Sequence, residues 1–265
     1  MTSLDEATSR GSRRGPPRLS RRAFLIAALI VPAGAAAGVL DWIFTDDRPK
    51  QEVFRPMRLR PAQVVDLRRW KIGLPTATEI SNPKLESYSS PSFQAVQAVQ
   101  FTVHCGDTAQ PGSNYPRSEL REMNTDGSNA SWASTSGTHT MDLTARVTHL
   151  PVVKPTLVCA QIHNADYLIL VALSGKVLSV RYVDSVAGVL DDNYQLGTSF
   201  DLRLVAAGGF VDVYYNGTRK VHQAMEESGC YFKAGCYLQS NTSTGDAPTA
   251  YGQVEISSLT ITHSA

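Results

Sequence analysis

The sequence predicts an all-β domain, a sandwich or β-jelly roll, on the strength of three observations. From Trp70 onward, short runs that alternate apolar and polar residues are separated by Gly, Pro, Asn and Ser, which is typical of strands and turns. Asn216-Gly217 directly after Tyr214-Tyr215 is a strong signal for a two-residue hairpin. No internal repeat and no second class of composition follows residue 60, so residues 61–265 are best explained as one domain.

The composition sets limits on the function. The chain has 265 residues, 42% of them hydrophobic, which is ordinary for a globular protein. Its 25 Lys and Arg nearly balance its 24 Asp and Glu, and the balance also holds after residue 48. Because no net positive field attracts polyanions, nucleic acid is not expected as a partner. An anionic ligand would have to be held by a local cluster of charges.

Residues 1–48 are expected to be a twin-arginine export signal with a flexible N-terminus, followed by a linker at 49–60. Several arginines precede an apolar run rich in Ala and Gly, from Ala23 to Leu40, and Ser20-Arg21-Arg22-Ala23-Phe24-Leu25 fits the twin-arginine pattern. The alternative is an uncleaved membrane anchor, because the apolar stretch approaches the ~20 residues that span a bilayer. Pro32 favours a removable signal, so we expect a secreted protein that meets a membrane only through this segment.

The elements of the domain follow from the same alternation. Pro61 to Leu67 is the one short segment that looks helical. The candidate strands are Gln94 to Val103, Thr138 to Val147, Thr156 to His163, Tyr167 to Leu173, Val177 to Val183, Ser199 to Ala206, Phe210 to Tyr215, Tyr231 to Gln239 and Gly252 to Thr262. Residues 124–136 and 186–193 are expected to be loops that border a groove.

Three segments carry a polar face that suggests chemistry. In residues 231–239, alternation sends Phe232, Ala234, Cys236 and Leu238 to the core and Tyr231, Lys233, Tyr237 and Gln239 to the opposite face. The same logic groups Arg117, Glu119 and Arg121 on one strand, and Gln161 and His163 on another. Taken singly, each set could be a solvated surface ladder or a hydrogen-bonded histidine. Together they predict one polar groove that can hold and protonate an anionic ligand.

The four cysteines, Cys105, Cys159, Cys230 and Cys236, all lie after the predicted signal, where oxidation is permitted. Cys230 and Cys236 cannot bridge within a straight strand, because six residues at ~3.3 Å each exceed the reach of a disulfide. A turn at Ser228-Gly229 would allow that pair, so it stays a possible disulfide. No Cys-x-x-Cys or His-x-x-x-His spacing supports a metal site.

The motifs RSELRE at 117–122, QIH at 161–163 and YFKAGCYLQ at 231–239 resemble those of the alginate lyases of polysaccharide lyase family 7. Trp70-Lys71-Ile72-Gly73-Leu74-Pro75 resembles the opening strand of that family, and Tyr115-Pro116 precedes the first motif as it often does there. The resemblance runs from about residue 60 to the C-terminus. It implies a β-jelly roll of two curved antiparallel sheets, with an anionic uronate polysaccharide, alginate, bound in the concave face. It also implies β-elimination without metal or cofactor.

The resemblance implies a role for each residue of the groove. Arg117 and Gln161 would neutralise the C6 carboxylate while the C5 proton is removed. His163 would be the base and Tyr237 the acid on guluronate, and Tyr237 could serve as both on mannuronate. The substrate-binding set is Glu119, Arg121, Lys233, Tyr231 and Gln239, with Glu119 orienting an arginine through an ion pair. In that family, isoleucine in QIH is associated with acceptance of guluronate-containing blocks.

Three alternatives stay open at this point. A non-catalytic carbohydrate-binding module would keep the basic and amide side chains but would not need His163 and Tyr237 together. A glycoside hydrolase needs two carboxylates flanking the bond, whereas Glu119 and Glu122 fall on opposite strand faces. A lyase acting on glucuronan or another polyuronate would use the same chemistry. No segment signals a subunit interface, so a monomer is expected.

Overall fold

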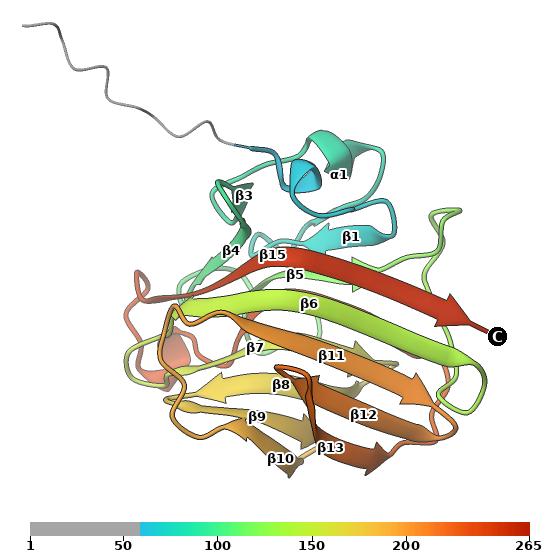
Figure 1. The fold of residues 1–265 in the computed structure, drawn as a ribbon. Coiled ribbons are helices and arrows are strands. Elements are labelled where there is room, and N and C mark those ends of the chain that lie inside the picture. The colour runs from blue at the N-terminus through green and yellow to red at the C-terminus, as the bar shows by residue number, and fades with distance from the viewer. Residues whose placement is uncertain (1–58) are drawn as a thin grey trace, which may run out of the picture. The chain divides into compact units, whose positions relative to one another are not determined.

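In the computed structural model, which describes residues 59–265, antiparallel strands form two sheets that stack as curved layers (Figure 1). One sheet has eight strands in the order β10 (Ser185–Asp191), β9 (Val177–Tyr182), β8 (Tyr167–Ser174), β7 (Thr156–His163), β14 (Tyr231–Leu238), β5 (Arg117–Glu122), β1 (Trp70–Gly73) and β2 (Glu79–Ile80). The other has seven, in the order β13 (Thr218–Ala224), β12 (Phe210–Tyr215), β11 (Phe200–Ala207), β6 (Thr138–His149), β15 (Tyr251–Ser264), β4 (Val99–His104) and β3 (Phe93–Ala95). The all-β prediction is confirmed.

The core lies between the two sheets and is built by period-two alternation. Along β6 every second residue is buried, and β14 sends its apolar residues to the same interior. Large side chains from both sheets fill the space, among them Trp70, Phe93, Phe101, Phe200 and Phe232. Burying one such side chain stabilises the fold by roughly 1.5–3 kcal/mol, so the inner faces fix which faces of the strands remain for function.

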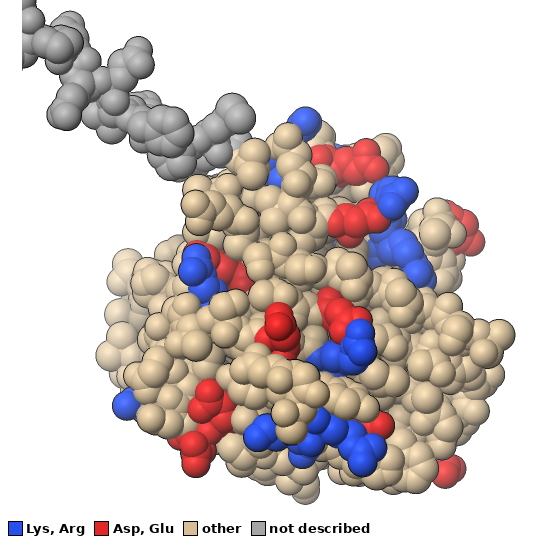
Figure 2. Space-filling view, in the orientation of Figure 1, with Lys and Arg blue, Asp and Glu red and all other residues tan. Residues whose placement is uncertain are grey.

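The outer face of the seven-stranded sheet carries charges of both signs close together (Figure 2). Arg203 pairs with Asp142 at 2.6 Å across β11 and β6, and Arg146 pairs with Glu255 at 2.5 Å across β6 and β15. These cations already have carboxylate partners. On β6, β11 and β15 the positive charge of these two arginines is therefore balanced by neighbouring carboxylates.

The helical segments are short and only partly coincide with the predicted one. Of the segment from Pro61 to Leu67, only the 3-10 helix η1 (Pro61–Gln63) forms, and Val65 and Leu67 turn into the core instead. A four-residue helix α1 (Lys84–Ser87) and a 3-10 helix η2 (Thr242–Thr244) were not predicted. Each has a single turn or less, which is too short to show a helical apolar period.

Most predicted strands are confirmed to within a residue or two at either end, and the hairpin at Asn216-Gly217 joins β12 to β13. Both turn residues have positive φ, 49° and 78°, as a tight hairpin requires. The predicted strand from Gln94 to Val103 is wrong as one element, because it breaks into β3 and β4. Residues 186–193 were predicted as a loop but largely form the edge strand β10, whose Val186 and Val189 are exposed and break the alternation.

The possible disulfide between Cys230 and Cys236 does not form, and all four cysteines are free and buried. The chain bends at Ser228 and Gly229, but the backbone of Cys230 then pairs with that of Trp132 just before β14 begins. Cys236 lies in the middle of the extended strand with its side chain in the core. Burial raises the pKa of Cys230 to about 12, which keeps its thiol protonated.

The predicted export signal and most of the predicted linker fall in residues 1–58, outside the described residues. Leu59, which belongs to the predicted linker, already pairs with Ala95 of β3. No helix within residues 59–265 combines the length and apolarity that crossing a membrane requires.

Candidate active site

The three motif strands are neighbours in the eight-stranded sheet, in the order β7, β14, β5. Strand β14 has the predicted alternation, with Phe232, Ala234, Cys236 and Leu238 fully buried toward the core. Across the ladders, Lys233 lies opposite both Gln161 of β7 and Arg121 of β5. Tyr231 lies opposite His163, Tyr237 opposite Arg117, and Gly235 opposite Glu119. The pairing thus brings the predicted polar residues of three distant segments onto one sheet face.

Glu119 is the buried anion at the centre of this face. Lys233 Nζ lies 2.5 Å and Arg117 Nη1 lies 3.6 Å from its Oε2, while Gln161 donates a hydrogen bond to its Oε1. Burial would raise the pKa of Glu119, but the charges of Lys233 and Arg117 outweigh it and hold the pKa below its ordinary value. The predicted ion pair of Glu119 with an arginine is present, and the lowered pKa keeps this carboxylate ionised.

Arg117 and Tyr237 form a second unit beside Glu119. The guanidinium carbon of Arg117 lies 4.0 Å from the centre of the Tyr237 ring, a cation–π contact. Both side chains also reach the hydroxyl of Ser113, at 2.7 Å from Arg117 Nη2 and 3.1 Å from the Tyr237 oxygen. The phenol of Tyr237 is thereby fixed next to a permanent positive charge.

His163 is held by its Nδ1 atom. That nitrogen lies 2.9 Å from the Asn164 carbonyl, which can only accept, and 3.0 Å from the Tyr231 hydroxyl. A proton on Nδ1 leaves Nε2 of the neutral ring with a free lone pair. Burial, helped by the charges of Lys233 and Arg117, lowers the pKa of His163 and favours this neutral form. The histidine is therefore prepared to accept a proton.

Arg121 and Tyr231 pack together rather than against Tyr237. The guanidinium carbon of Arg121 lies 3.9 Å from the centre of the Tyr231 ring, and its Nη1 donates to the Glu122 carbonyl at 2.6 Å. Burial raises the pKa of Tyr231, against the opposing charge of Arg121, so this phenol stays protonated. Among the described residues, the ring that Arg121 contacts is therefore that of Tyr231.

A groove runs over this face as two adjoining cavities of about 350 and 520 Å³. Both are lined by Ser113, Arg117 and His163, so the reactive side chains lie where the two cavities meet. The first also contains Gln161, Tyr237 and Gln239, and the second contains Glu119, Arg121, Tyr231 and Lys233. A larger cavity of about 690 Å³ lies around η1 and α1 and contains none of the predicted site residues.

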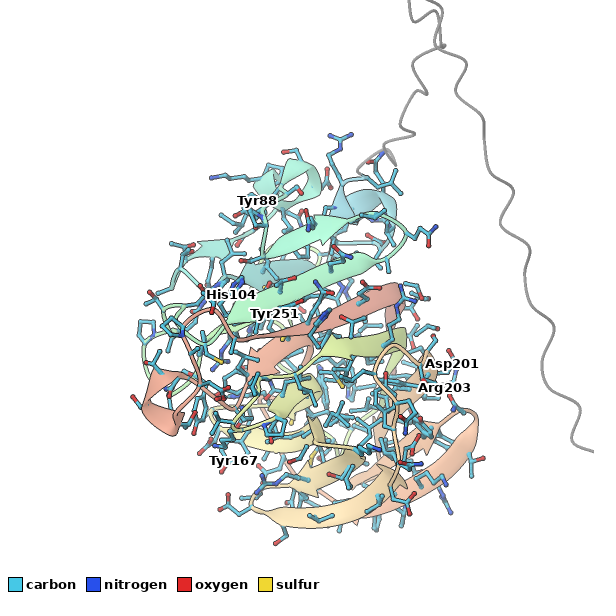
Figure 3. All side chains as sticks on the ribbon, turned by 90° about the vertical axis from the view of Figure 1, so that its left-hand side faces the viewer. Tyr88, His104, Tyr167, Asp201, Arg203 and Tyr251 are labelled. Atoms are coloured by element: carbon cyan, nitrogen blue, oxygen red, sulfur yellow. The ribbon has the colours of Figure 1, made fainter. Side chains whose placement is uncertain are left out.

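The structure adds groove residues that the sequence reasoning missed. Tyr167 of β8 and Arg181 of β9 line the first cavity, and Lys71 of β1 lines the second. Strand alternation could have found Lys71 and Arg181, because each lies between core residues of its strand. In Figure 3, Tyr167 lies on the opposite side of the view from Asp201 and Arg203 of β11, which belong to the other sheet.

The two loops predicted to border the groove contribute little to its lining. From residues 124–136 only Asn129 lines either cavity, and no residue of 186–193 does. The segment that borders the groove instead precedes β5, at residues 110–115, and includes Ser113.

Glu122 is confirmed on the opposite face of β5, where Trp132 Nε1 donates to its Oε2 at 3.0 Å. Within residues 59–265, no group of three or more His, Cys, Asp or Glu could hold a metal ion.

The model of a family described as alginate lyase matches residues 65–263. The chain belongs to the alginate lyase family. Members of this family in polysaccharide lyase family 7 have the same two-sheet jelly roll, which confirms the predicted fold class, and the family makes the chain a polysaccharide lyase.

Several solved alginate lyases are similar to the chain. Alginate lyase AlgAT5 from polysaccharide lyase family 7 is 48% identical, with a TM-score of 0.77, covering 78% of this chain and 100% of that one. The alginate lyase from Corynebacterium sp. is 40% identical, with a TM-score of 0.76, covering 79% and 100%. The marine family 7 alginate lyase AlyA1 from Zobellia galactanivorans is 29% identical, with a TM-score of 0.67, covering 78% and 100%. None of the curated proteins matches the chain.

Proposed function

We propose that this alginate lyase cleaves its polymer by metal-independent β-elimination, with guluronate-containing blocks favoured, and leaves 4-deoxy unsaturated uronate ends. The observation that carries the proposal is that a neutral histidine, His163, and a phenol, Tyr237, face one groove together with Arg117 and Gln161. Removal of the C5 proton builds negative charge on the C6 carboxylate, and Arg117 and Gln161 are placed to stabilise it. Electrostatic stabilisation thus comes from the chain's own side chains.

The arrangement of acid and base supports a preference for guluronate. On a guluronate unit, the C5 proton and the leaving oxygen lie on opposite faces of the sugar, so the base and the acid must be two separate groups. His163 on β7 and Tyr237 on β14 are separate in this way. Ile162 is fully buried on the core face of β7, so its influence on uronate choice acts through the placement of Gln161 and His163.

The cationic groups along the groove support binding of neighbouring uronate units. Lys71, Arg121 and Lys233 line the second cavity, and Arg181 lines the first together with the neutral amide of Gln239. A polyuronate carries one carboxylate per sugar, and charge-assisted hydrogen bonds to such groups are strong. Glucuronan or another polyuronate would meet the same groups, so the test must include one.

The test is a comparison of polymers by ultraviolet absorbance of the new C4=C5 double bond, in the presence of a chelator. We expect absorbance to rise fastest with polyguluronate, more slowly with polymannuronate, and not with glucuronan. Activity that disappears with the chelator would contradict metal independence. A faster rise with polymannuronate or glucuronan would contradict the assigned preference.

We also propose that the chain is exported through the twin-arginine pathway and acts outside the cell as a monomer. The support is the pattern of residues 20–25 and the apolar run that follows. Replacing Arg21 and Arg22 with lysine should retain the protein inside the cell, as measured by lyase activity in the medium. Unchanged secretion of that variant would contradict the proposal, and sizing of the secreted protein tests its monomeric state.

A further inference from the structure

The hydroxyl of Ser113 lies at the junction of the two cavities and contacts both Arg117 and Tyr237. We infer that Ser113 is a positioning residue for the elimination: its hydroxyl fixes Arg117 and Tyr237, and it donates a hydrogen bond to the Tyr237 oxygen when the phenol gives up its proton. The inference rests on the proposed function. It assigns a role to a residue outside the three motifs.

The donors and acceptors around the Ser113 hydroxyl determine its hydrogen bonds before any proton is transferred. A serine hydroxyl donates one hydrogen bond and accepts two. The Tyr115 carbonyl, 3.0 Å away, can only accept, and Arg117 Nη2, 2.7 Å away, can only donate. When Ser113 donates to Tyr115, its second acceptor position receives the Tyr237 hydroxyl at 3.1 Å. In this state the proton lies on Tyr237, which is the form that a general acid needs.

The same contacts also fit the deprotonated state. When Tyr237 gives its proton to O4, its oxygen becomes an anion that can only accept hydrogen bonds. Rotation about the Cβ–Oγ bond of Ser113 then turns the hydroxyl proton from the Tyr115 carbonyl to the Tyr237 oxygen. The Ser113 oxygen keeps the Arg117 donor, and the backbone N–H of Tyr115 lies 3.4 Å away as its second donor. Ser113 therefore has partners in both states without moving its backbone.

The proton and electron balance of the step is complete. The C5 proton passes to Nε2 of His163, and the C5–H electron pair forms the C4=C5 bond. The electron pair of the C4–O bond leaves with O4, which takes the Tyr237 proton. The imidazolium of His163 then returns a proton through water to the phenolate of Tyr237, and Ser113 turns back to the Tyr115 carbonyl. No oxidant, reductant or added ion is required.

Ser113 also sets the orientation of Arg117. It accepts from Nη2 at 2.7 Å, while Glu119 lies 3.6 Å from Nη1, so the two residues hold different ends of one guanidinium group. The cation–π contact with Tyr237 at 4.0 Å follows from this placement. Loss of the Ser113 hydroxyl would leave the Tyr237 oxygen and one end of Arg117 without this shared partner.

The test compares Ser113→Ala with Ser113→Thr, which keeps a hydroxyl. We expect Ser113→Ala to lower kcat about 10- to 100-fold, the effect of losing a hydrogen bond to a developing anion, and to change KM little. Ser113→Thr should recover most of kcat. Ser185→Ala, an exposed serine on β10 that lines neither cavity, is the control and should match the wild type.

Three results would overturn the inference: an unchanged kcat in Ser113→Ala, a rise in KM with kcat retained, or equal impairment of the alanine and threonine variants. Thermal unfolding of both variants, measured alongside, should match the wild type. An inactive wild type on every uronate polymer would overturn the proposed function and this inference with it. An active wild type with an equally active Ser113→Ala variant would overturn the inference alone.

Discussion

Glu119 is the residue on which the rest of the site depends, although it takes no part in the proposed proton transfers. It is buried, and Lys233, Arg117 and Gln161 all use it as their common acceptor. The sequence predicted the face that Glu119 occupies and its ion pair with an arginine. It could not predict that Lys233 would be the nearest cation, because that contact depends on the register between β14 and β5, which alternation alone leaves open.

The protonation of His163 leads to a prediction about pH. A base must be neutral to accept the C5 proton, and burial together with Lys233 and Arg117 lowers the pKa of His163. With a lowered pKa, the imidazole stays neutral at pH values below about 6.5, which is the ordinary pKa of histidine. We therefore expect the acid limb of the kcat/KM profile to lie below about pH 6.5. A limb at or above that value would contradict the assignment of His163 as the base.

Strand β14 shows how one element serves both the core and the groove. Between Ala234 and Tyr237 the ladder to β7 changes register, and Gly235 in this stretch has φ of 145°. A Cβ atom at Gly235 would lie 2.6 Å from the Ser118 carbonyl oxygen and 2.8 Å from Glu119 Cα. Only glycine allows β5 to approach this closely, and that approach brings Glu119 beneath the site.

Replacing Gly235 with alanine should therefore destabilise the protein and disturb the site. We expect the free energy of unfolding in urea to fall by about 3 kcal/mol, from strained backbone and overpacking together, and kcat to fall with it. Gly127→Ala is the matched control, because Gly127 also has positive φ, 82°, but has open space around its added Cβ. It should lose about 1 kcal/mol and keep its activity. Equal losses in both variants would show that the close approach to β5 is unimportant.

The strands differ in how well the sequence predicted them, for a physical reason. β7 and β12 have the predicted bounds because each combines apolar residues with clear turn signals at its ends. β10 and β13 lie at the sheet edges and bury little, so their sequences lack alternation. The loop before β5 was missed as part of the site because neither period nor spacing places Ser113 against Tyr237, which is 124 positions away.

Across the whole molecule, Glu122 connects the two sheets beneath the active site. It lies on the core side of β5, where His263 of β15 approaches its Oε1 at 2.7 Å and the Phe232 N–H donates to its Oε2 at 2.9 Å. His263 in turn lies 2.7 Å from His139 of β6, Nδ1 to Nδ1. Burial would raise the pKa of Glu122, but these hydrogen bonds outweigh it and lower the pKa.

Removing the His263 side chain should show how much this connection stabilises the fold. We expect His263→Ala to lower the free energy of unfolding at neutral pH by about 3 kcal/mol, because a buried carboxylate loses a hydrogen-bond partner. The contribution of Glu122 is present above its ordinary pKa and is lost as pH falls through its lowered folded value, so the difference should shrink in acid. His104→Ala, at an exposed site on β4, is the control. A difference that does not depend on pH would contradict this account.

The most direct test of the central claim is the steady-state kcat on polyguluronate of His163→Ala and Tyr237→Phe, each compared with the wild type by absorbance of the unsaturated product. We expect both variants to lose at least about 100-fold in kcat, the usual contribution of a general acid or base, while they still bind the polymer. Either variant retaining a kcat close to that of the wild type would contradict the claim that these two side chains carry the proton transfers of the elimination.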